Sequence, residues 1–467
     1  MKKFVVLLAV VAISCLSSAA FAADIAVSGS LDIRSRDFSN LDAVSSDVAD
    51  NGAQRDTQER VRLTVDAKSG DVKGRISIEN DWDSWGRLEI KQANGATATS
   101  EGTYDGGIAH SILDLREAWI NFNLPGLPIN VNAGHQLLQL GNAWFFRDMK
   151  YGSDAWVVAN VTGPNTVALV DIKVSEGLTG AADDLDAYAL LDVIKLSDTM
   201  AVGVDLTNVH DRKAALTTPG VFALNRDPLV PGFNPFKKIN LDNLGVNFNG
   251  QLGPVNLKAE ADYQFGKAEA DGINNITDAK FKGNQVVVQG NVALDPVTIN
   301  FTAARGSGFK TDDNDVKQMV TILDADQHYT FLYEYKVRTA ALNVPSSAGG
   351  TDSLHTGFAN TTALNVGAKF AATKSLTIGA DLWWLQATQA VAINGATDAF
   401  GGAATSRKLG TEVDLAINWQ MYDALSWNWE LGYFKPGEAY DTGSAVPGLN
   451  TSADKVLGVQ GVLSYKF

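Results

Sequence analysis

The chain has very little cysteine, and it has no long apolar segment after its first two dozen residues. Its one cysteine, Cys15, lies in the N-terminal segment MKKFVVLLAVVAISCLSSAAFA. Once that segment is removed, no disulfide framework can form. Beyond residue 22 no run of 18 or more apolar residues occurs, which excludes a membrane-spanning helix.

The N-terminal segment has the features of a secretory signal peptide. Lys2 and Lys3 form its basic start, the apolar stretch 4–13 its core, and Ala20-Phe21-Ala22 a small-residue cleavage site. We therefore predict a signal peptide over residues 1–22 and a single mature domain over 23–467. A lipoprotein acylated at Cys15 is the less favoured alternative.

Positive charge is also scarce. The whole chain has 38 basic and 53 acidic residues, and removing Lys2 and Lys3 leaves a net charge of −17. Such an acidic surface argues against nucleic acid or anionic lipid as a partner. The histidines are scattered without metal-ligand spacing, and neither GxSxG, HExxH nor a phosphate-binding glycine loop occurs. We predict that the protein is not an enzyme and has no cofactor.

The dominant pattern is alternation of apolar and polar residues with a period of two. The segment SLTIGADLWW at 375–384 places apolar residues at every second position, and EVDLAINWQM at 412–421 does the same. The last residues, KVLGVQGVLSYKF, follow the same rule and end on an aromatic side chain. Alternation over this length predicts β-strands with one apolar face.

The connections between these segments differ in length in a regular way. Short turns rich in Gly, Pro, Asn and Asp alternate with long polar stretches, notably 83–112, 210–241 and 307–359. A sheet in lipid must close on itself because no unpaired backbone edge is tolerated there. Charged residues on the second face then line a water-filled interior, so the pattern predicts a transmembrane β-barrel. A soluble β-sandwich or β-helix is the alternative, and aromatic residues at the strand ends argue against it.

The alternation and the turns predict an all-β, antiparallel, up-and-down barrel of about 18 strands, with 16 or 20 as alternatives. The count becomes 20 if segment 328–338 pairs with 316–323. An 18-stranded barrel is wide enough for an aqueous channel unless a loop narrows it. The predicted strands are 24–36, 59–67, 72–82, 113–124, 129–139, 154–162, 166–174, 185–196, 200–209, 242–252, 255–266, 283–294, 297–306, 360–372, 376–388, 408–421, 425–435 and 455–467.

With its signal peptide, paired hairpins and final Tyr465-Lys466-Phe467, the chain resembles the Gram-negative outer-membrane porins. The resemblance implies insertion into the outer membrane and passive diffusion of small hydrophilic solutes and ions. It also implies that Tyr465 and Phe467 form the signal read by the barrel-assembly machinery, and it leaves open a homotrimer. A substrate-specific channel for carbohydrates or organic acids, with loop 307–359 as its filter, is the alternative. A plugged structural or adhesive barrel is a third.

Arginines gather on the predicted inner faces of neighbouring strands. We expect these six to line one wall as a basic ladder that selects solutes, or simply to pair with acids on the same wall: Arg34, Arg36, Arg60, Arg62, Arg75 and Arg116. Asp148 and Asp154, beside the aromatic run 144–146, are the predicted acids of a constricting loop. Glu260 and Asp262 are expected to face them from the opposite wall.

Much of the acidic excess falls in predicted loops. One interpretation is an acidic vestibule that attracts cations. The favoured one is bridging by Ca²⁺ or Mg²⁺ to the phosphates of lipopolysaccharide, since hard cations prefer carboxylate oxygens. The residues concerned are Asp42, Asp47, Asp50, Asp56, Asp83, Asp183, Asp184, Asp312, Asp313 and Asp315.

Overall fold

A computed structural model describes most of the chain after its N-terminal segment. The described residues are 24–41, 43, 53–85, 89–91, 97–99, 113–176, 184–212, 236–270, 277–308, 315–323, 328–337, 357–397, 403–441 and 452–467. The predicted signal peptide, residues 1–22, lies outside them.

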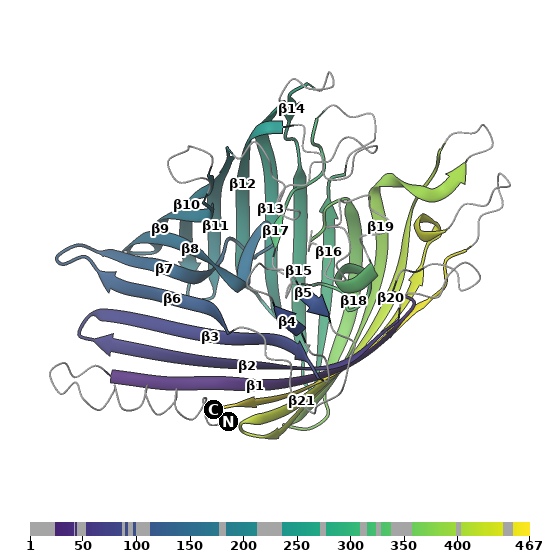
Figure 1. Ribbon diagram of the computed structural model, residues 1–467, viewed down its shortest axis with the longest axis horizontal. Coiled ribbons are helices and arrows are strands. Elements are labelled where there is room, and N and C mark those ends of the chain that lie inside the picture. The colour runs from purple at the N-terminus through teal and green to yellow at the C-terminus, as the bar shows by residue number, and fades with distance from the viewer. Residues whose placement is uncertain are drawn as a thin grey trace.

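Within the described residues, eighteen long antiparallel strands form one closed barrel (Figure 1). All eighteen predicted strands are found. They are β1 (Asp24–Ser39), β2 (Gln54–Ser69), β3 (Val72–Ser84), β6 (Asp114–Asn123), β7 (Ile129–Gln139), β8 (Phe146–Thr162), β9 (Asn165–Ser175), β10 (Leu185–Ser197), β11 (Met200–Asp211), β12 (Phe236–Leu252), β13 (Val255–Ala270), β15 (Asn284–Leu294), β16 (Val297–Gly306), β18 (Thr361–Ala371), β19 (Leu376–Thr397), β20 (Ala403–Tyr422), β21 (Leu425–Pro436) and β22 (Val456–Lys466).

The last strand closes the barrel against the first. β22 pairs antiparallel with β1 from Ser30↔Lys466 to Ser39↔Leu457, and Figure 1 shows the purple β1 beside the yellow end of the chain. Phe467 continues the ladder through two backbone hydrogen bonds with Gly29, of 3.0 and 3.1 Å. The chain therefore ends in a strand because its terminal residues are needed to pair the free edge of β1.

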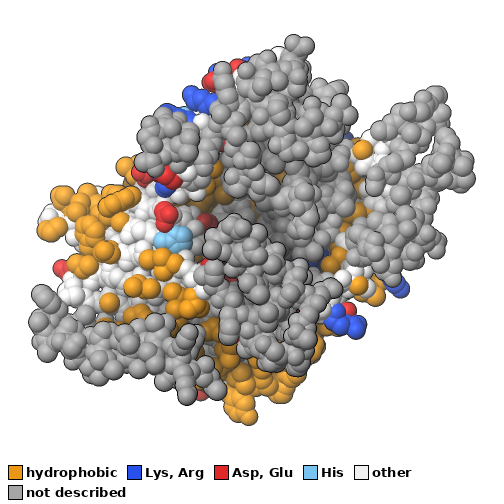
Figure 2. Space-filling model, in the orientation of Figure 1, with side chains coloured by type: hydrophobic (Ala, Val, Ile, Leu, Met, Phe, Trp, Pro, Cys, Tyr) orange, Lys and Arg blue, Asp and Glu red, His pale blue; other side chains and the backbone are white. Residues whose placement is uncertain are grey.

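The two faces of the wall have opposite character. Large apolar side chains on the outer face are exposed to the surroundings, for example Val27 (60%), Leu169 (59%) and Ile76 (58%). Figure 2 shows such hydrophobic side chains covering much of the described outer surface on this side. Polar and charged side chains alternate with them on the inner face. An exposed apolar belt of this extent is the surface that a membrane covers. No helix among the described residues is long and apolar enough to cross a membrane.

Eight short turns join consecutive strands at one end of the barrel, and the strands reach further at the other end than predicted. β1 runs to Ser39 and β2 starts at Gln54, so both strands are longer than the predicted 24–36 and 59–67. β12 likewise starts at Phe236, inside the predicted loop 210–241. The ladder continues at this end into segments such as Gln54–Gln58, where polar residues occupy successive positions and the alternation that identifies a strand is lost.

Smaller elements occupy the long connections. β4 (Glu89–Lys91) and β5 (Thr97–Thr99) form a separate hairpin, whereas β14 (Ala279–Lys280) and β17 (Ile322–Leu323) add short pairings to the barrel. Segment 328–338 was the candidate for a nineteenth strand. Its described part contains a π-helical turn, η1 (Tyr333–Val337), so the 20-stranded alternative is wrong. A 3₁₀ turn, η3 (Glu438–Tyr440), follows β21.

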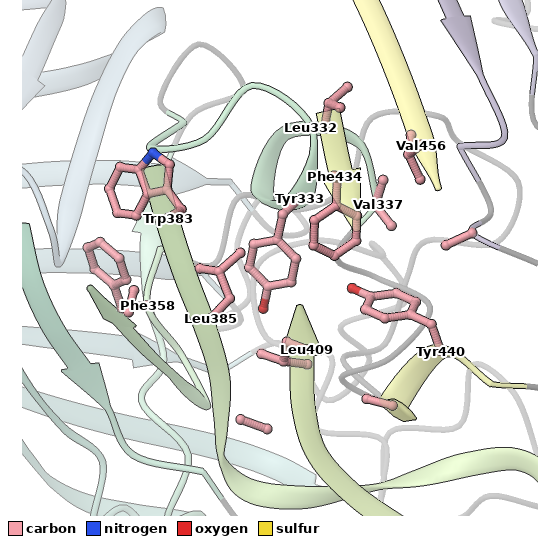
Figure 3. Close-up of a cluster of buried hydrophobic side chains, with 14 of the residues drawn as sticks. Leu332, Tyr333, Val337, Phe358, Trp383, Leu385, Leu409, Phe434, Tyr440 and Val456 are labelled. Atoms are coloured by element: carbon pink, nitrogen blue, oxygen red, sulfur yellow. The ribbon is translucent and has the colours of Figure 1, made fainter. Parts of the chain in front are cut away.

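Most of the aromatic residues predicted for the membrane interface lie on the outer face, including Tyr422 (73% exposed) and Trp384 (60%). Trp383 does not: it is 5% exposed and faces the interior. There it joins an aromatic cluster that includes Tyr333 and Phe434 (Figure 3). A barrel lumen filled only with water would not bury these rings, so part of the chain must be folded inside.

Candidate functional site

Residues 140–145, between β7 and β8, form the first of two segments that fold into the barrel. We call them the first lumen segment. The carboxylate of Glu260 on β13 accepts hydrogen bonds from the backbone N–H groups of Asn142 and Trp144, the latter at 3.1 Å. The Asn142 side chain donates to the carbonyl of Ala259 at 2.8 Å. The segment thus crosses from β7 and β8 to a distant part of the wall.

Asp262 supports the same contact from the next inward position of β13. Its carboxylate accepts hydrogen bonds from Asn243 at 2.9 Å and from Gln285 at 2.8 Å. Gln285 also donates to the carbonyl of Trp144 at 3.0 Å. Glu260 and Asp262 therefore face the interior, as predicted, yet they are 4% and 5% exposed and bind the inserted segment and its supports.

Residues 328–337, the second lumen segment, are held in the same way by another part of the wall. Glu412 on β20 is fully buried and accepts hydrogen bonds from the N–H groups of Leu332 at 2.6 Å and Tyr333 at 2.7 Å. Asp414 accepts a longer one, 3.4 Å, from Phe331. Buried carboxylates that accept backbone N–H groups fix a chain segment because an unpaired charge there would be costly.

The wall makes room for this segment with glycine. A Cβ atom on Gly432 would lie 2.7 Å from the ring of Phe331, and one on Gly458 would lie 2.7 Å from Leu332. Leu332 and Tyr333 pack beside Phe434 in the cluster of Figure 3. Hydrogen bonds to buried carboxylates and close packing against glycines therefore act together to fix the second lumen segment in place.

The two segments meet inside the barrel. Trp144 of the first lies 6.5 Å, between ring centroids, from Tyr329 of the second, and both rings contact Phe358, at 4.8 and 4.1 Å. β17 pairs in parallel with the start of β8, and Val320 donates to Gln264 on β13 at 3.0 Å. Parts of loop 307–359 thus lie in the lumen, and together with the first lumen segment they narrow it.

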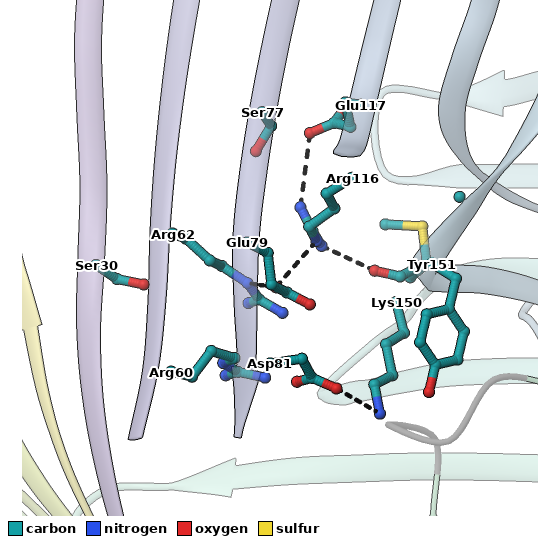
Figure 4. Close-up of polar contacts among 12 residues, drawn as sticks. Ser30, Arg60, Arg62, Ser77, Glu79, Asp81, Arg116, Glu117, Lys150 and Tyr151 are labelled. Atoms are coloured by element: carbon teal, nitrogen blue, oxygen red, sulfur yellow. Dashed lines mark hydrogen bonds and ion pairs between the residues drawn. The ribbon is translucent and has the colours of Figure 1, made fainter. Parts of the chain in front are cut away.

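The six predicted arginines lie together on the inner wall formed by β1, β2, β3 and β6, where five of them form ion pairs; Figure 4 shows Arg60, Arg62 and Arg116 of this set. The pairs are Arg36–Asp56 (2.7 Å), Arg60–Asp32 (3.3 Å), Arg62–Glu79, Arg75–Asp66 (2.7 Å), Arg75–Glu117 (3.5 Å), Arg116–Glu79 (3.6 Å) and Arg116–Glu117 (3.6 Å). The wall is an ion-pair network whose opposite charges largely cancel, which agrees with the second of the two interpretations of the arginines.

Arg34 is the exception in this wall. It donates to Gln58 at 3.2 Å, and its guanidinium lies 3.7 Å from the ring centroid of Trp82. Arg60 lies 4.3 Å from the same ring. Trp82 has a positive φ of 46°, and the ladder between β2 and β3 is irregular beside it. Both guanidinium groups thus stack against one indole, which helps to hold them in place.

Asp148 and Asp154 do not form the predicted acidic edge of a constricting loop, because both lie within β8. Asp148 accepts hydrogen bonds from Ser153 at 2.7 Å and from the N–H of Gly152. The side chain of Asp154 is 71% exposed, on the outer face, and pairs with His135 at 2.8 Å. Trp144 of the neighbouring aromatic run 144–146 does reach the constriction, through its backbone groups and through its ring.

Several residues of the lumen were not identified from the sequence. Lys150 on β8 pairs with Asp81 at 3.1 Å and extends the ion-pair wall (Figure 4). Glu412 and Asp414 were visible as polar members of an alternating strand. Nothing in the sequence indicated that they bind the backbone of a segment some 80 residues away.

The predicted peripheral cation sites receive no support from clustering. Among the described residues, no three carboxylate, histidine or cysteine side chains gather closely enough to hold a metal ion. Asp56, predicted in a loop, belongs to β2 and binds Arg36. Asp315 contacts Lys282 at 2.6 Å, and this hydrogen bond lowers the pKa of the Asp315 carboxyl. Asp42, Asp47, Asp50, Asp183, Asp312 and Asp313 lie outside the described residues.

Comparison with known proteins gives one family model and several solved structures. The family model, described as alginate export, matches residues 237–448. OccK9 (OpdG) of Pseudomonas aeruginosa is 12% identical with a TM-score of 0.53, and OccK8 (OprE) of the same species is 10% identical with 0.52. A BenF-like porin from Pseudomonas fluorescens Pf-5 is 10% identical with 0.51. Each match covers 95% of this chain and 98% of the other. No curated protein matches the chain.

These matches extend over nearly the whole barrel, although the sequence identities are so low that the matches show the fold alone. They confirm the predicted 18-stranded antiparallel barrel and the resemblance to the Gram-negative outer-membrane porins. The outer membrane is the location that this fold and its exposed apolar belt require.

Proposed function

We propose that this barrel, which has the fold of the outer-membrane porins, is a passive channel for small hydrophilic solutes and is selective rather than general. One observation carries the proposal: two chain segments lie inside the barrel and are fixed there by buried Glu260 and Glu412. A wide pore needs no such anchors. A fixed constriction discriminates among solutes by size and by the polar groups that it presents.

The protein contributes geometry and polar contacts to this function, and no chemical step. We propose that it acts without a cofactor and is not an enzyme. The BenF-like porin named above supports a porin function by analogy of fold alone. Contact with lipopolysaccharide, recognition of Tyr465 and Phe467 by the assembly machinery, and trimer formation stay predictions.

Single-channel recording in planar bilayers tests this proposal. We expect discrete steps of low conductance that permeating solutes reduce further, because a solute in the constriction displaces ions. Large ohmic steps without solute block would indicate a general pore. A purified, folded barrel that gives no steps would indicate a plugged structural barrel and would overturn the channel.

A second candidate is export of an anionic polysaccharide, which the alginate export model favours. The matched region includes Glu260, Asp262, Glu412 and Asp414 on the inner face. These acids are engaged in holding the inserted segments and their supports, and two anchored segments obstruct a long polymer. Alginate oligomers that blocked the current at micromolar concentration would favour export over the first candidate.

A further inference from the structure

The lumen contains a chamber next to the second lumen segment. It has a volume of about 670 Å³ and is lined by residues 328–331 together with the inner faces of strands from β12 to β21. It reaches Thr199 at the short turn between β10 and β11. A solute that passes the constriction enters this space, whose size is that of a small-molecule site.

Carboxamides dominate the wall of the chamber. Seven of them come from five consecutive strands of the barrel: Asn249, Gln251, Asn256, Gln289, Asn291, Asn300 and Asn365. Asn256 donates to Asn291 at 3.1 Å, and Asn300 stands opposite Asn291 in the ladder. Each amide offers two donors and one acceptor oxygen, so the row can exchange hydrogen bonds with groups that both donate and accept.

Part of this hydrogen-bonding capacity is unused within the protein. Asn300 donates to Asp381 at 2.6 Å, but its buried Oδ1 atom has no partner among the residues that the structure describes. Buried polar atoms are normally paired, so an orphan on a chamber wall indicates a position for a ligand or solvent donor.

Charges in the chamber nearly cancel, and its acids are already engaged. Lys258 and Lys369 face Asp381, Asp414 and Glu430. Asp381 accepts from Asn300 and Asn365, Asp414 from a backbone N–H, and Glu430 from Gln460 at 3.2 Å. A chamber of this kind has no excess of positive charge with which to hold a carboxylate or phosphate.

Aromatic rings complete the lining. Trp383 and Tyr329, whose ring centroids lie 5.4 Å apart, border the chamber together with Phe331. Flat apolar rings beside a row of amides match a solute with an apolar ring face and hydroxyl groups around its edge. Hydroxyl groups donate and accept at the same atom, as the amides require.

We propose that this chamber binds a neutral mono- or disaccharide during its passage through the barrel. The proposal rests on the channel function argued above and names its solute class. The ion-pair wall of β1, β2, β3 and β6 lies outside the chamber and contributes to the field of the lumen. The amide row makes the specific contacts.

Current block by maltose, measured on the full-length mature barrel in planar bilayers, tests the proposal, with sodium benzoate as the acidic comparison. We expect maltose to block and benzoate to have little effect. Replacing Gln289 and Asn291 together by Ala removes two amides, and we expect maltose block to weaken about tenfold. The control is Asn121→Ala, which removes an inward amide of β6 outside the chamber and leaves the block unchanged.

The outcomes separate the two proposals. Absence of channel steps in the wild type overturns the channel and the chamber together. Channel steps without maltose block, equal block in the double variant, or stronger block by benzoate overturn the saccharide chamber and leave the channel standing. If the double variant does not insert, Gln289→Ala alone is measured, with an expected weakening of about threefold.

Discussion

The anchoring of the second lumen segment gives the sharpest prediction, through the substitution Glu412→Gln. Glu412 accepts two N–H groups at 2.6 and 2.7 Å, and bonds to a charged acceptor contribute about 1.5–3 kcal/mol each. Gln keeps one acceptor oxygen without charge and turns an NH₂ group toward the second N–H. We estimate a loss of about 3 kcal/mol, which raises the undocked population of the segment about 100-fold.

The segment should loosen but not leave the barrel entirely. Phe331, Leu332 and Tyr333 remain buried, at 4%, 0% and 0% exposure, and each such side chain contributes about 1.5–3 kcal/mol. In single-channel recordings we therefore expect brief openings to a higher conductance on top of the wild-type level.

Glu430→Gln is the matched control for this experiment. Glu430 faces the lumen from the neighbouring strand β21 but binds Gln460 and not the inserted segment. Its substitution should leave the opening frequency unchanged. If Glu412→Gln and Glu430→Gln give the same current trace as the wild type, the carboxylate does not hold the constriction and the reasoning is refuted.

Three further predictions follow from the wall. Gly432→Ala places a Cβ 2.7 Å from a ring carbon of the second lumen segment. It should lower the stability of the barrel by about 1–3 kcal/mol in thermal melts and raise the single-channel conductance. Gly379→Ala, where the nearest contact of the new Cβ is 3.5 Å, should change neither. Replacing Arg60 and Arg62 by Gln leaves their partner carboxylates without a compensating positive charge. A carboxylate about 8 Å from a permeating cation in water attracts it by about 0.5 kcal/mol, so the preference for cations should rise about twofold per residue. An unchanged reversal potential would contradict this. Deleting Phe467 removes two backbone bonds and should reduce the heat-resistant folded fraction on gels; an unaltered fraction would show that β1 closes without it.

Sequence reasoning succeeded for properties that depend on a single strand, such as which side chains face the lumen. Arg60 and Arg62 were placed on the inner face because Val61 and Leu63 alternate with them, and the ladder confirms that assignment. It failed for Asp154, which stands two residues before the outward-facing Trp156 in an unbroken stretch of the β8–β9 ladder and therefore lies on the outer face. A loop was also predicted where β8 continues, since its first residues lack alternation.

Alternation, turn residues and the closing aromatic strand indicated by themselves a barrel of about 18 strands with an apolar exterior and a charged interior, and the structure fixed the count at eighteen. Each of these signals is local, because every strand in lipid must turn an apolar face toward the hydrocarbon and form a complete set of backbone hydrogen bonds with its neighbouring strands. Only the tertiary structure decided what fills the lumen. Glu260 meets Asn142, and Glu412 meets Leu332, across long stretches of sequence. Such contacts depend on the curvature of the closed wall, which brings distant strands together, and no periodic pattern along the chain encodes it.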